Sequence, residues 1–187
     1  MDEKRLEWEV LDSETILHTR VFDVKSSRRR SATGVTGDYL TIDTSDWVLT
    51  IPVIDGDLIL VRQWRHGSEA LTLEFPGGVT DPGETPEQAG LRELEEETGF
   101  RAGRIRVLGR CRPNPAIMSN YITFCLAEDL VQTGQQHLDR DEVLEWVRVP
   151  FGEALEAFCS GEYENAFMGT GFSLYMRHLM REGKLEL

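Results

Sequence analysis

Four charged residues near the middle of the chain have the types and the spacing of a metal-binding site: Arg92, Glu93, Glu96 and Glu97. In an α-helix, which turns by roughly 100° per residue, Glu93 and Glu97 lie one turn apart with Glu96 beside them. Three carboxylates on one face repel each other, and clustered oxygen ligands suit a hard divalent ion such as Mg²⁺ or Mn²⁺. The simplest alternative is a solvated acidic face of a helix.

The helix that carries these residues is predicted from signals at both of its ends. Thr85 is a good N-cap, Pro86 suits the first helical position, and Gln88 completes a capping box with Thr85. Gly99 can adopt the left-handed conformation that ends a helix. We therefore expect a helix over residues 86–98.

The other elements are predicted from apolar patterns and turn residues. Gly34 and Gly37 mark one turn, Asp55-Gly56-Asp57 marks a hairpin, and residues 74–78 and 81–83 are expected to break regular structure. Strands are expected over 6–11, 19–25, 38–42, 47–54, 58–64, 104–112, 121–127 and 143–149, and two closing helices over 151–159 and 164–181. Strands with helices between and after them predict an α+β fold, an α/β/α sandwich with a mixed central sheet.

The composition narrows the classes of partner and substrate. The chain has 187 residues, enough for one domain with a small appendage, and a formal charge of −13. This acidity disfavours binding to nucleic acid or anionic membranes, and a phosphorylated substrate would need local cations. The three cysteines are widely spaced without a CxxC pair, and no apolar run is long enough to span a bilayer. We therefore expect a cytoplasmic protein without disulfides.

The spacing of the glycines and charged residues resembles the Nudix box at every fixed position. The matching residues are Gly78, then Glu84, then Arg92-Glu93-Leu94, then Glu96-Glu97, then Gly99-Phe100. The resemblance implies a Nudix hydrolase, which cleaves the pyrophosphate of a nucleoside diphosphate linked to another group. It implies Mg²⁺ (or Mn²⁺) held by Glu93, Glu96, Glu97 and the carbonyl group of Gly77. Arg92 and Glu84 would support these carboxylates.

Residues upstream of the box are similar to the ADP-ribose pyrophosphatase branch of this family. The similarity rests on Val61-Arg62-Gln63-Trp64-Arg65 followed by Glu74-Phe75-Pro76-Gly77-Gly78. It implies that Arg65 contacts the diphosphate and that Glu74 and Val79 also bind substrate. Downstream, Pro115 lies where the branch has a marker proline, but Ala116 replaces the usual glycine. GDP-mannose and other nucleotide sugars therefore stay open as substrates.

The N-terminal region also fits this branch. The resemblance implies that residues 1–45 form a small antiparallel sheet, exchanged across a homodimer, before a catalytic domain at residues 46–187. Tyr39 and Phe22 are the candidates for stacking on the nucleotide base, although strand aromatics more often belong to a core. Three arginines at positions 28–30 either help to hold phosphates or form a solvated hairpin tip.

A general base is expected outside the box, because enzymes of this branch take it from a later loop. Asp141 and Glu142 compete for this role, and a plain polar loop is the alternative. The predicted reaction is Mg²⁺-dependent hydrolysis of a nucleoside diphosphate sugar, ADP-ribose above others, to AMP and ribose 5-phosphate. The alternatives are hydrolysis of nucleoside triphosphates or dinucleoside polyphosphates, and a non-catalytic module that binds a nucleotide sugar.

Overall fold

The computed structural model describes residues 3–140 and 142–185, and its contacts divide these into two units. The first unit takes in the described residues up to 45 together with residues 112–121, and the second contains the rest. The loop 112–121 belongs to the first unit through backbone hydrogen bonds. The N–H of Ile42 donates to the carbonyl of Ile117 at 2.7 Å, and that of Ser119 donates to the carbonyl of Ile42 at 3.0 Å.

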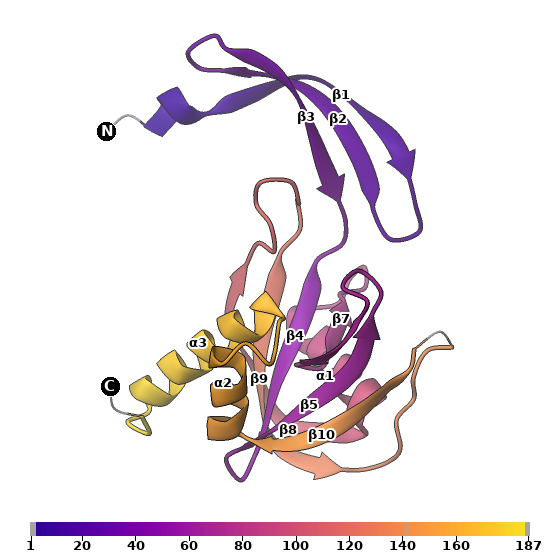
Figure 1. The fold of residues 1–187 in the computed structure, drawn as a ribbon, viewed down its shortest axis with the longest axis vertical. Helices are drawn as coiled ribbons and strands as arrows, with labels where there is room; N and C mark the ends of the chain where they lie inside the picture. The colour runs from indigo at the N-terminus through magenta and orange to yellow at the C-terminus, as the bar shows by residue number, and fades with distance from the viewer. Residues whose placement is uncertain (1–2, 141, 186–187) are drawn as a thin grey trace. The chain divides into compact units, whose positions relative to one another are not determined.

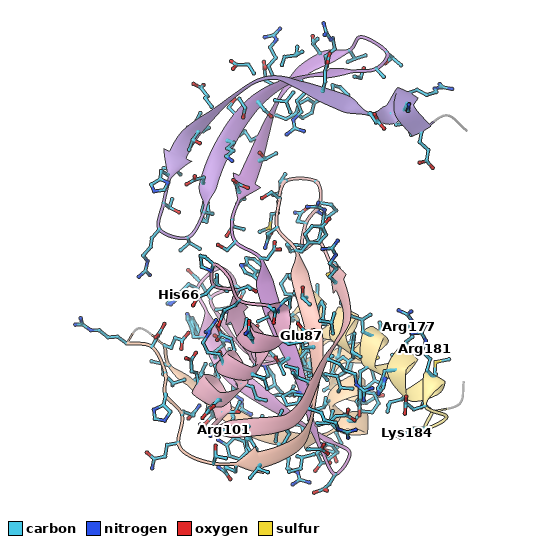
Figure 2. All side chains as sticks on the ribbon, turned by 180° about the vertical axis from the view of Figure 1, so that it is seen from behind. His66, Glu87, Arg101, Arg177, Arg181 and Lys184 are labelled. Atoms are coloured by element: carbon cyan, nitrogen blue, oxygen red, sulfur yellow. The ribbon has the colours of Figure 1, made fainter. Side chains whose placement is uncertain are left out.

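The first unit is built on a three-stranded antiparallel sheet. A short 3₁₀ helix, η1 (Glu3–Leu6), precedes β1 (Trp8–His18), β2 (Asp23–Ser31) and β3 (Thr36–Asp43), which lie in the order β1-β2-β3 (Figure 1). Side chains extend from both faces of this sheet (Figure 2), and every residue of β1 is exposed. The small antiparallel sheet expected before the catalytic region is confirmed.

Several details predicted for this unit are wrong. The strand expected over 19–25 begins only at Asp23, because the Thr19 hydroxyl group closes a turn by donating to the carbonyl of Phe22 at 2.6 Å. Gly37 lies inside β3 and only Gly34, with φ of +89°, marks the turn. The three arginines at 28–30 lie within β2 and not at a hairpin tip.

The second unit contains a mixed sheet in the order β10-β5-β4-β9-β8, with β6 added to β5 and β7 added to β4 (Figure 1). Strands β4 and β9 run parallel, and the other pairs are antiparallel. The bounds are β4 (Trp47–Ile54), β5 (Asp57–Arg65), β6 (Ala70–Glu74), β7 (Gly77–Val79), β8 (Phe100–Cys111), β9 (Ile122–Gln132) and β10 (Leu144–Pro150). The break expected over 74–78 is therefore wrong in part, because both of its ends belong to short strands.

The local signals that predicted the hairpin and the central helix are confirmed. Asp55 and Gly56 have φ of 54° and 88° in the turn between β4 and β5. Helix α1 is Pro86–Thr98, with both hydrogen bonds of the capping box at Thr85 and a left-handed Gly99 after its end. The two closing helices are α2 (Phe151–Cys159), as expected, and α3 (Ala166–Arg181), which begins two residues later than expected.

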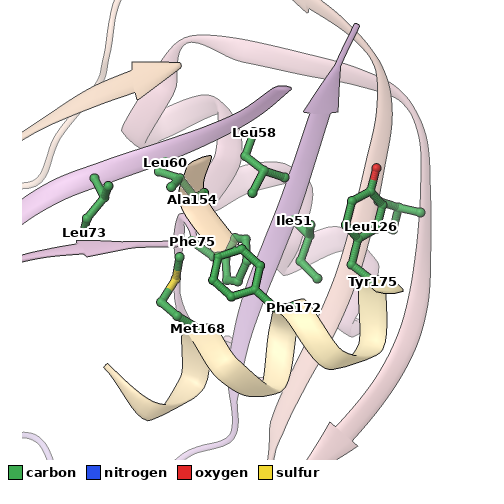
Figure 3. Packing of buried hydrophobic residues seen from close by; sticks show 10 residues of the cluster. All are labelled: Ile51, Leu58, Leu60, Leu73, Phe75, Leu126, Ala154, Met168, Phe172 and Tyr175. Carbon is green, nitrogen blue, oxygen red and sulfur yellow. The ribbon is translucent and has the colours of Figure 1, made fainter. Parts of the chain in front are cut away.

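The side chains of β4 alternate between two layers of helices, as a strand buried on both faces requires. Val48 packs with Ala89 of α1, whereas Ile51 lies in a larger cluster with Phe172 of α3. Figure 3 shows this larger cluster, in which the ring of Phe172 meets that of Phe75 at 5.5 Å. Helix α1 on one face and α2 and α3 on the other confirm the α/β/α sandwich. Among the described residues, no helix combines the length and hydropathy needed to cross a bilayer.

Candidate active site

The three carboxylates predicted to share one face of α1 do so, and they range from exposed to buried. Exposure of the side chain is 42% for Glu96 and 13% for Glu93, and Glu97 as a residue is only 3% exposed. The buried carboxylate of Glu97 accepts a hydrogen bond of 2.8 Å from the backbone N–H of Gly77. The start of β7 and the last turn of α1 are therefore joined at this carboxylate.

Burial disfavours the ionised form of two of these carboxylates, Glu93 and Glu97, when no cation is bound. The pKa of Glu97 is raised to about 8, chiefly by burial and in part by the charges of Glu93 and Glu142, although the hydrogen bond from Gly77 opposes the shift. Burial also raises the pKa of Glu93, although the hydrogen bond from Arg92 opposes this. Buried groups of one sign are stabilised by a cation between them, so the arrangement favours a bound positive charge.

Arg92 organises the exposed side of the cluster. Its Nη1 donates to Glu93 at 2.8 Å and to Glu96 at 3.1 Å, and its Nε and Nη2 each donate to Glu84 at 3.0 Å. Nη2 also donates to the carbonyl of Val79 at 3.0 Å. These bonds, first of all those to Glu84, hold the pKa of Arg92 above its usual range. One guanidinium therefore joins the loop before α1 to the carboxylates.

Gly78 lies against the cluster with no room for a side chain. A Cβ atom at this position would stand 2.5 Å from Oε1 of Glu93. At Gly77 a Cβ would instead meet the backbone carbonyl of Val48 at 2.1 Å. Gly78 therefore leaves space for the carboxylate of Glu93, whereas Gly77 allows β7 to lie against β4.

The chemistry of these donors fits a hard divalent ion. They are three carboxylates and the nearby carbonyl of Gly77, all oxygen, and the close approach at Gly78 leaves a cradle that a Cβ would fill. Within residues 3–140 and 142–185, no three Asp, Glu, His or Cys side chains already converge on one point. Arg92 occupies an oxygen of Glu93 and one of Glu96. The second oxygen of each carboxylate is not bonded to Arg92, so an ion could bind there while Arg92 keeps its hydrogen bonds.

Arg65 and Glu74 form a paired unit beside the cluster. Nε and Nη2 of Arg65 donate to the two oxygens of Glu74 at 2.8 and 2.7 Å, and the hydroxyl group of Thr72 also bonds to Glu74 at 2.5 Å. The side chain of Glu74 is 3% exposed and that of Arg65 is 48% exposed. Burial alone would raise the pKa of Glu74, but the bonds from Arg65 lower it overall. The fixed guanidinium keeps a partly exposed face for an anion.

Of the two candidate bases, Glu142 lies near the cluster and Asp141 falls outside the described residues. The charge of Glu142 raises the pKa values of Glu93 and Glu97 and that of Arg65. Glu142 is exposed, and its carboxylate accepts the backbone N–H of Asp139 at 3.2 Å. Of the two candidates, Glu142 is therefore the one that the described residues place within electrostatic reach of the cluster.

The loop before Glu142 is anchored to the end of α1 by two residues that the sequence did not single out. The backbone N–H of His137 donates to the carbonyl of Glu96 at 2.8 Å, and Nε2 of Gln136 donates to the carbonyl of Glu97 at 2.5 Å. The last carbonyls of a helix lack partners within it, so a loop can bind them. No local sequence signal identifies these contacts.

A cavity adjoins the cluster on the side of Arg65. It is lined by Arg65, Glu74, Gly77, Gly78 and Val79 and by residues from outside the box. Those further residues include Trp47 of β4 and Asn165 and Phe167 at the start of α3. None of the three was predicted as a site residue, and only the N-cap preference of asparagine could have drawn attention to Asn165.

The first unit contains a hollow of its own, at one of the two predicted aromatic residues. Tyr39 lines it together with Trp8, Arg29 and residues 115–119, and the rings of Tyr39 and Trp8 meet edge-to-face at 5.4 Å. Phe22 is 37% exposed in the turn between β1 and β2 and does not line this hollow. The structure therefore separates the two candidates for base stacking.

A known protein family matches a segment of this chain that contains most of the second unit. The family model described as "NUDIX domain" matches residues 46–165. This segment contains the cluster on α1, the pair of Arg65 and Glu74, and the loop of Glu142. It covers more than half of the chain.

Individual proteins extend the likeness over nearly the full length. The chain is 29% identical over 178 residues to "ADP compounds hydrolase NudE" of Escherichia coli (strain K12), covering 94% of this chain and 95% of that protein. It is 31% identical over 165 residues to "ADP-ribose pyrophosphatase" of Bacillus subtilis (strain 168), covering 87% and 89%. A solved structure titled "Crystal structure of ADP compounds hydrolase" superposes with a TM-score of 0.87 at 29% identity, covering 96% of this chain and 98% of that one.

Proposed function

Because this chain belongs to the Nudix family and is a Nudix hydrolase, we propose that it hydrolyses the pyrophosphate bond of a nucleoside diphosphate sugar. ADP-ribose, cleaved to AMP and ribose 5-phosphate, is the proposed substrate, and the names of two relatives support a compound containing ADP. The observation that carries the proposal is the set of Glu93, Glu96 and Glu97 beside the Gly77–Val79 strand, with Arg65 next to it.

Glu93, Glu96, Glu97 and the carbonyl of Gly77 would hold Mg²⁺ or Mn²⁺. Such an ion neutralises the charge of a diphosphate and makes a bound water more acidic. The chain itself is strongly acidic, with a formal charge of −13, so an anionic substrate needs this compensation.

The remaining roles fall to residues around the cluster. Arg65 binds anionic oxygens of the substrate, and Glu74 holds the guanidinium in one orientation through two parallel hydrogen bonds. Glu142 accepts the proton of the attacking water, and Asp141 is the competing candidate. Arg92 and Glu84 keep the carboxylates and the loop before α1 in place, and Val79 contributes to the wall of the cavity.

The first unit is proposed to bind the nucleotide base. Tyr39 is favoured over Phe22, because the hollow at Tyr39 offers the rings of Tyr39 and Trp8 with Arg29 beside them. Aromatic faces and a guanidinium are the groups on which bases stack. The matched test compares Tyr39→Leu with Phe22→Leu: only the first is expected to raise KM for ADP-ribose.

We also propose a homodimer that uses the sheet of the first unit. The sheet exposes many large apolar side chains, which a stable monomer rarely does. They include Val10, Ile16, Leu17 and Leu40, exposed by 53, 52, 51 and 59%. Sedimentation should give a dimer, and Leu40→Glu should weaken it; a monomer at all concentrations would contradict this part of the proposal.

A cytoplasmic location is proposed from the three cysteines. Cys111, Cys125 and Cys159 are all free thiols, as a reducing compartment maintains them. Cell fractionation tests this proposal, which is contradicted by recovery of the protein outside the cytoplasm.

One experiment separates the possible substrates. Purified protein with Mg²⁺ is given ADP-ribose, GDP-mannose, other nucleotide sugars, nucleoside triphosphates and dinucleoside polyphosphates, and the products are identified in H₂¹⁸O. The proposal predicts the highest kcat/KM for ADP-ribose, with one ¹⁸O atom in AMP or ribose 5-phosphate. A preference for GDP-mannose would replace ADP-ribose as the proposed substrate. A preference for triphosphates would refute the proposal.

A further inference from the structure

The cavity beside Gly77 and Gly78 has an apolar end, and of its residues only Val79 has a role in the function proposed above. Its volume is about 340 Å³, at the lower end of the range for small-molecule sites. Trp47, Val79, Ile122 and Phe167 supply the apolar lining. An apolar compartment next to a phosphate-binding group suggests that it accommodates an organic part of the substrate.

Three of these four residues form a row across neighbouring strands. Trp47 of β4 is paired with Val79 of β7 on one side and with Ile122 of β9 on the other. Side chains of paired residues lie on the same face of a sheet, so the three make one continuous surface. Val79 is 45% exposed and lies at its outer margin.

Phe167 closes this surface from α3. The side chain of Asn165 caps the helix by accepting the N–H of Phe167 at 2.9 Å, and Met168 anchors the same turn in the core (Figure 3). The ring centres of Phe167 and Trp47 are 6.3 Å apart with an interplanar angle of 70°. These rings meet edge-to-face and form an apolar corner of the cavity.

The polar end of the cavity lies on the side of the cluster on α1. Arg65, Glu74 and Asn165 line it, and the side chain of Asn165 helps to lower the pKa of Glu74, after the larger effect of Arg65. The start of α3 therefore lies at the same cavity as the residue that orients Arg65. A ligand here meets a cation and hydrogen-bonding groups at one end and apolar side chains at the other.

From this geometry we propose that the cavity binds the sugar ring on the non-nucleoside side of the diphosphate, and that Trp47 and Phe167 select which sugars are accepted. A sugar has hydroxyl groups for the polar end and a C–H surface for the apolar end. The base is proposed above to bind at Tyr39 in the first unit, which leaves the sugar as the organic group for this cavity. This inference rests on the proposed function and deepens it.

A crossed panel of substrates tests which half of the molecule occupies the cavity. The first set keeps ADP and varies the sugar among ribose, glucose and mannose; the second keeps ribose and exchanges adenine for guanine. In Phe167→Leu, the ratios of kcat/KM within the first set should change by about tenfold or more. The ratio within the second set should stay as in the wild type.

The control is Phe158→Leu, because Phe158 packs against Phe172 in the core and does not line the cavity. Its ratios should match the wild type. A second variant, Val79→Phe, changes a partly exposed residue and narrows the cavity, so it should penalise glucose and mannose more than ribose. A change in the base ratio, or unchanged sugar ratios in both cavity variants, would overturn the proposal.

A binding measurement separates failure of this inference from failure of the proposed function. With metal chelated by EDTA, thermal unfolding is followed with ADP-ribose or ADP at equal concentrations. ADP-ribose should raise the Tm of the wild type and of Phe158→Leu more than ADP does, and Phe167→Leu should lose this difference. The inference survives an inactive wild type if this pattern holds. It falls if ADP-ribose and ADP act alike on the wild type or if Phe167→Leu keeps the difference.

Discussion

The backbone N–H of Gly77 donates a 2.8 Å hydrogen bond to the carboxylate of Glu97, a residue twenty positions later in the chain. This bond joins a short strand to the last turn of α1 at the most buried carboxylate of the cluster. Burial raises the pKa of this carboxylate to about 8, which makes Glu97 costly to keep ionised without a cation. A bound positive charge would therefore stabilise the ionised form of Glu97.

Replacing Glu97 with Gln should remove most activity and leave the fold intact. The amide keeps the size of the side chain and an acceptor for Gly77, but loses the charge that binds the metal. We expect kcat to fall by about a thousandfold, since metal ions contribute several kcal/mol to such reactions. The matched control is Glu95→Gln on the same helix, where Glu95 pairs with Arg101 away from the cluster. Near-normal activity in Glu97→Gln would refute the metal assignment.

The same carboxylate should make the metal-free protein less stable as pH rises. In the unfolded chain Glu97 has its ordinary pKa of 4.5, and burial raises this to about 8 in the folded chain. Its stabilising contribution is complete below pH 4.5 and is lost as pH rises to about 8, by at most about 1.4 kcal/mol per pH unit. Thermal unfolding in EDTA should therefore give a steeper fall in Tm over this range for the wild type than for Glu97→Gln. Parallel profiles would contradict the shift.

Lysine in place of Arg65 should weaken substrate binding. Lysine cannot make the two parallel bonds to Glu74, so its charge is less well oriented for the diphosphate. We expect KM for ADP-ribose to rise about tenfold, the usual scale for a hydrogen bond to a charged group. Arg62→Lys on the same strand is the control, because Arg62 pairs with Glu145 in an exposed salt bridge. Equal effects of the two substitutions would rule out a specific role for Arg65.

Replacing three glycines with alanine, one at a time, should show which glycine is required for activity and which for stability. Gly78→Ala places Cβ 2.5 Å from an oxygen of Glu93, so activity should fall while Tm changes little. In Gly77→Ala the new Cβ would clash with the backbone carbonyl of Val48, so Tm should fall strongly. Gly67→Ala meets nothing within 4 Å and should change neither. Initial rates and thermal unfolding of the three variants test this order, and full activity of Gly78→Ala would contradict it.

The sequence predicted best those features that depend on neighbours along the chain. Helix α1 was placed correctly from Thr85, Pro86, Gln88 and Gly99, because caps act within one turn. The shared face of its glutamates follows from helical periodicity alone. The hairpin at Asp55 and Gly56 was predictable for the same reason, because its turn depends on adjacent residues.

Features made by distant segments were missed. Strands β6 and β7 pair with β5 and β4, whereas Pro76 and the glycines beside it locally predict a break. Asn165 lines one cavity with Glu74, and Phe167 contacts Trp47, although these pairs are about a hundred residues apart in the chain. No periodicity or cap encodes such contacts, so the cavity could not be predicted.

Mn²⁺ binding measured by electron paramagnetic resonance tests the proposed metal site most directly, since bound Mn²⁺ loses the sharp signal of the free ion. The wild type should deplete free Mn²⁺, Glu95→Gln should do so equally, and Glu97→Gln should bind the ion far more weakly. Equal Mn²⁺ binding by the wild type and Glu97→Gln would contradict the claim that the acidic face of α1 is the metal site.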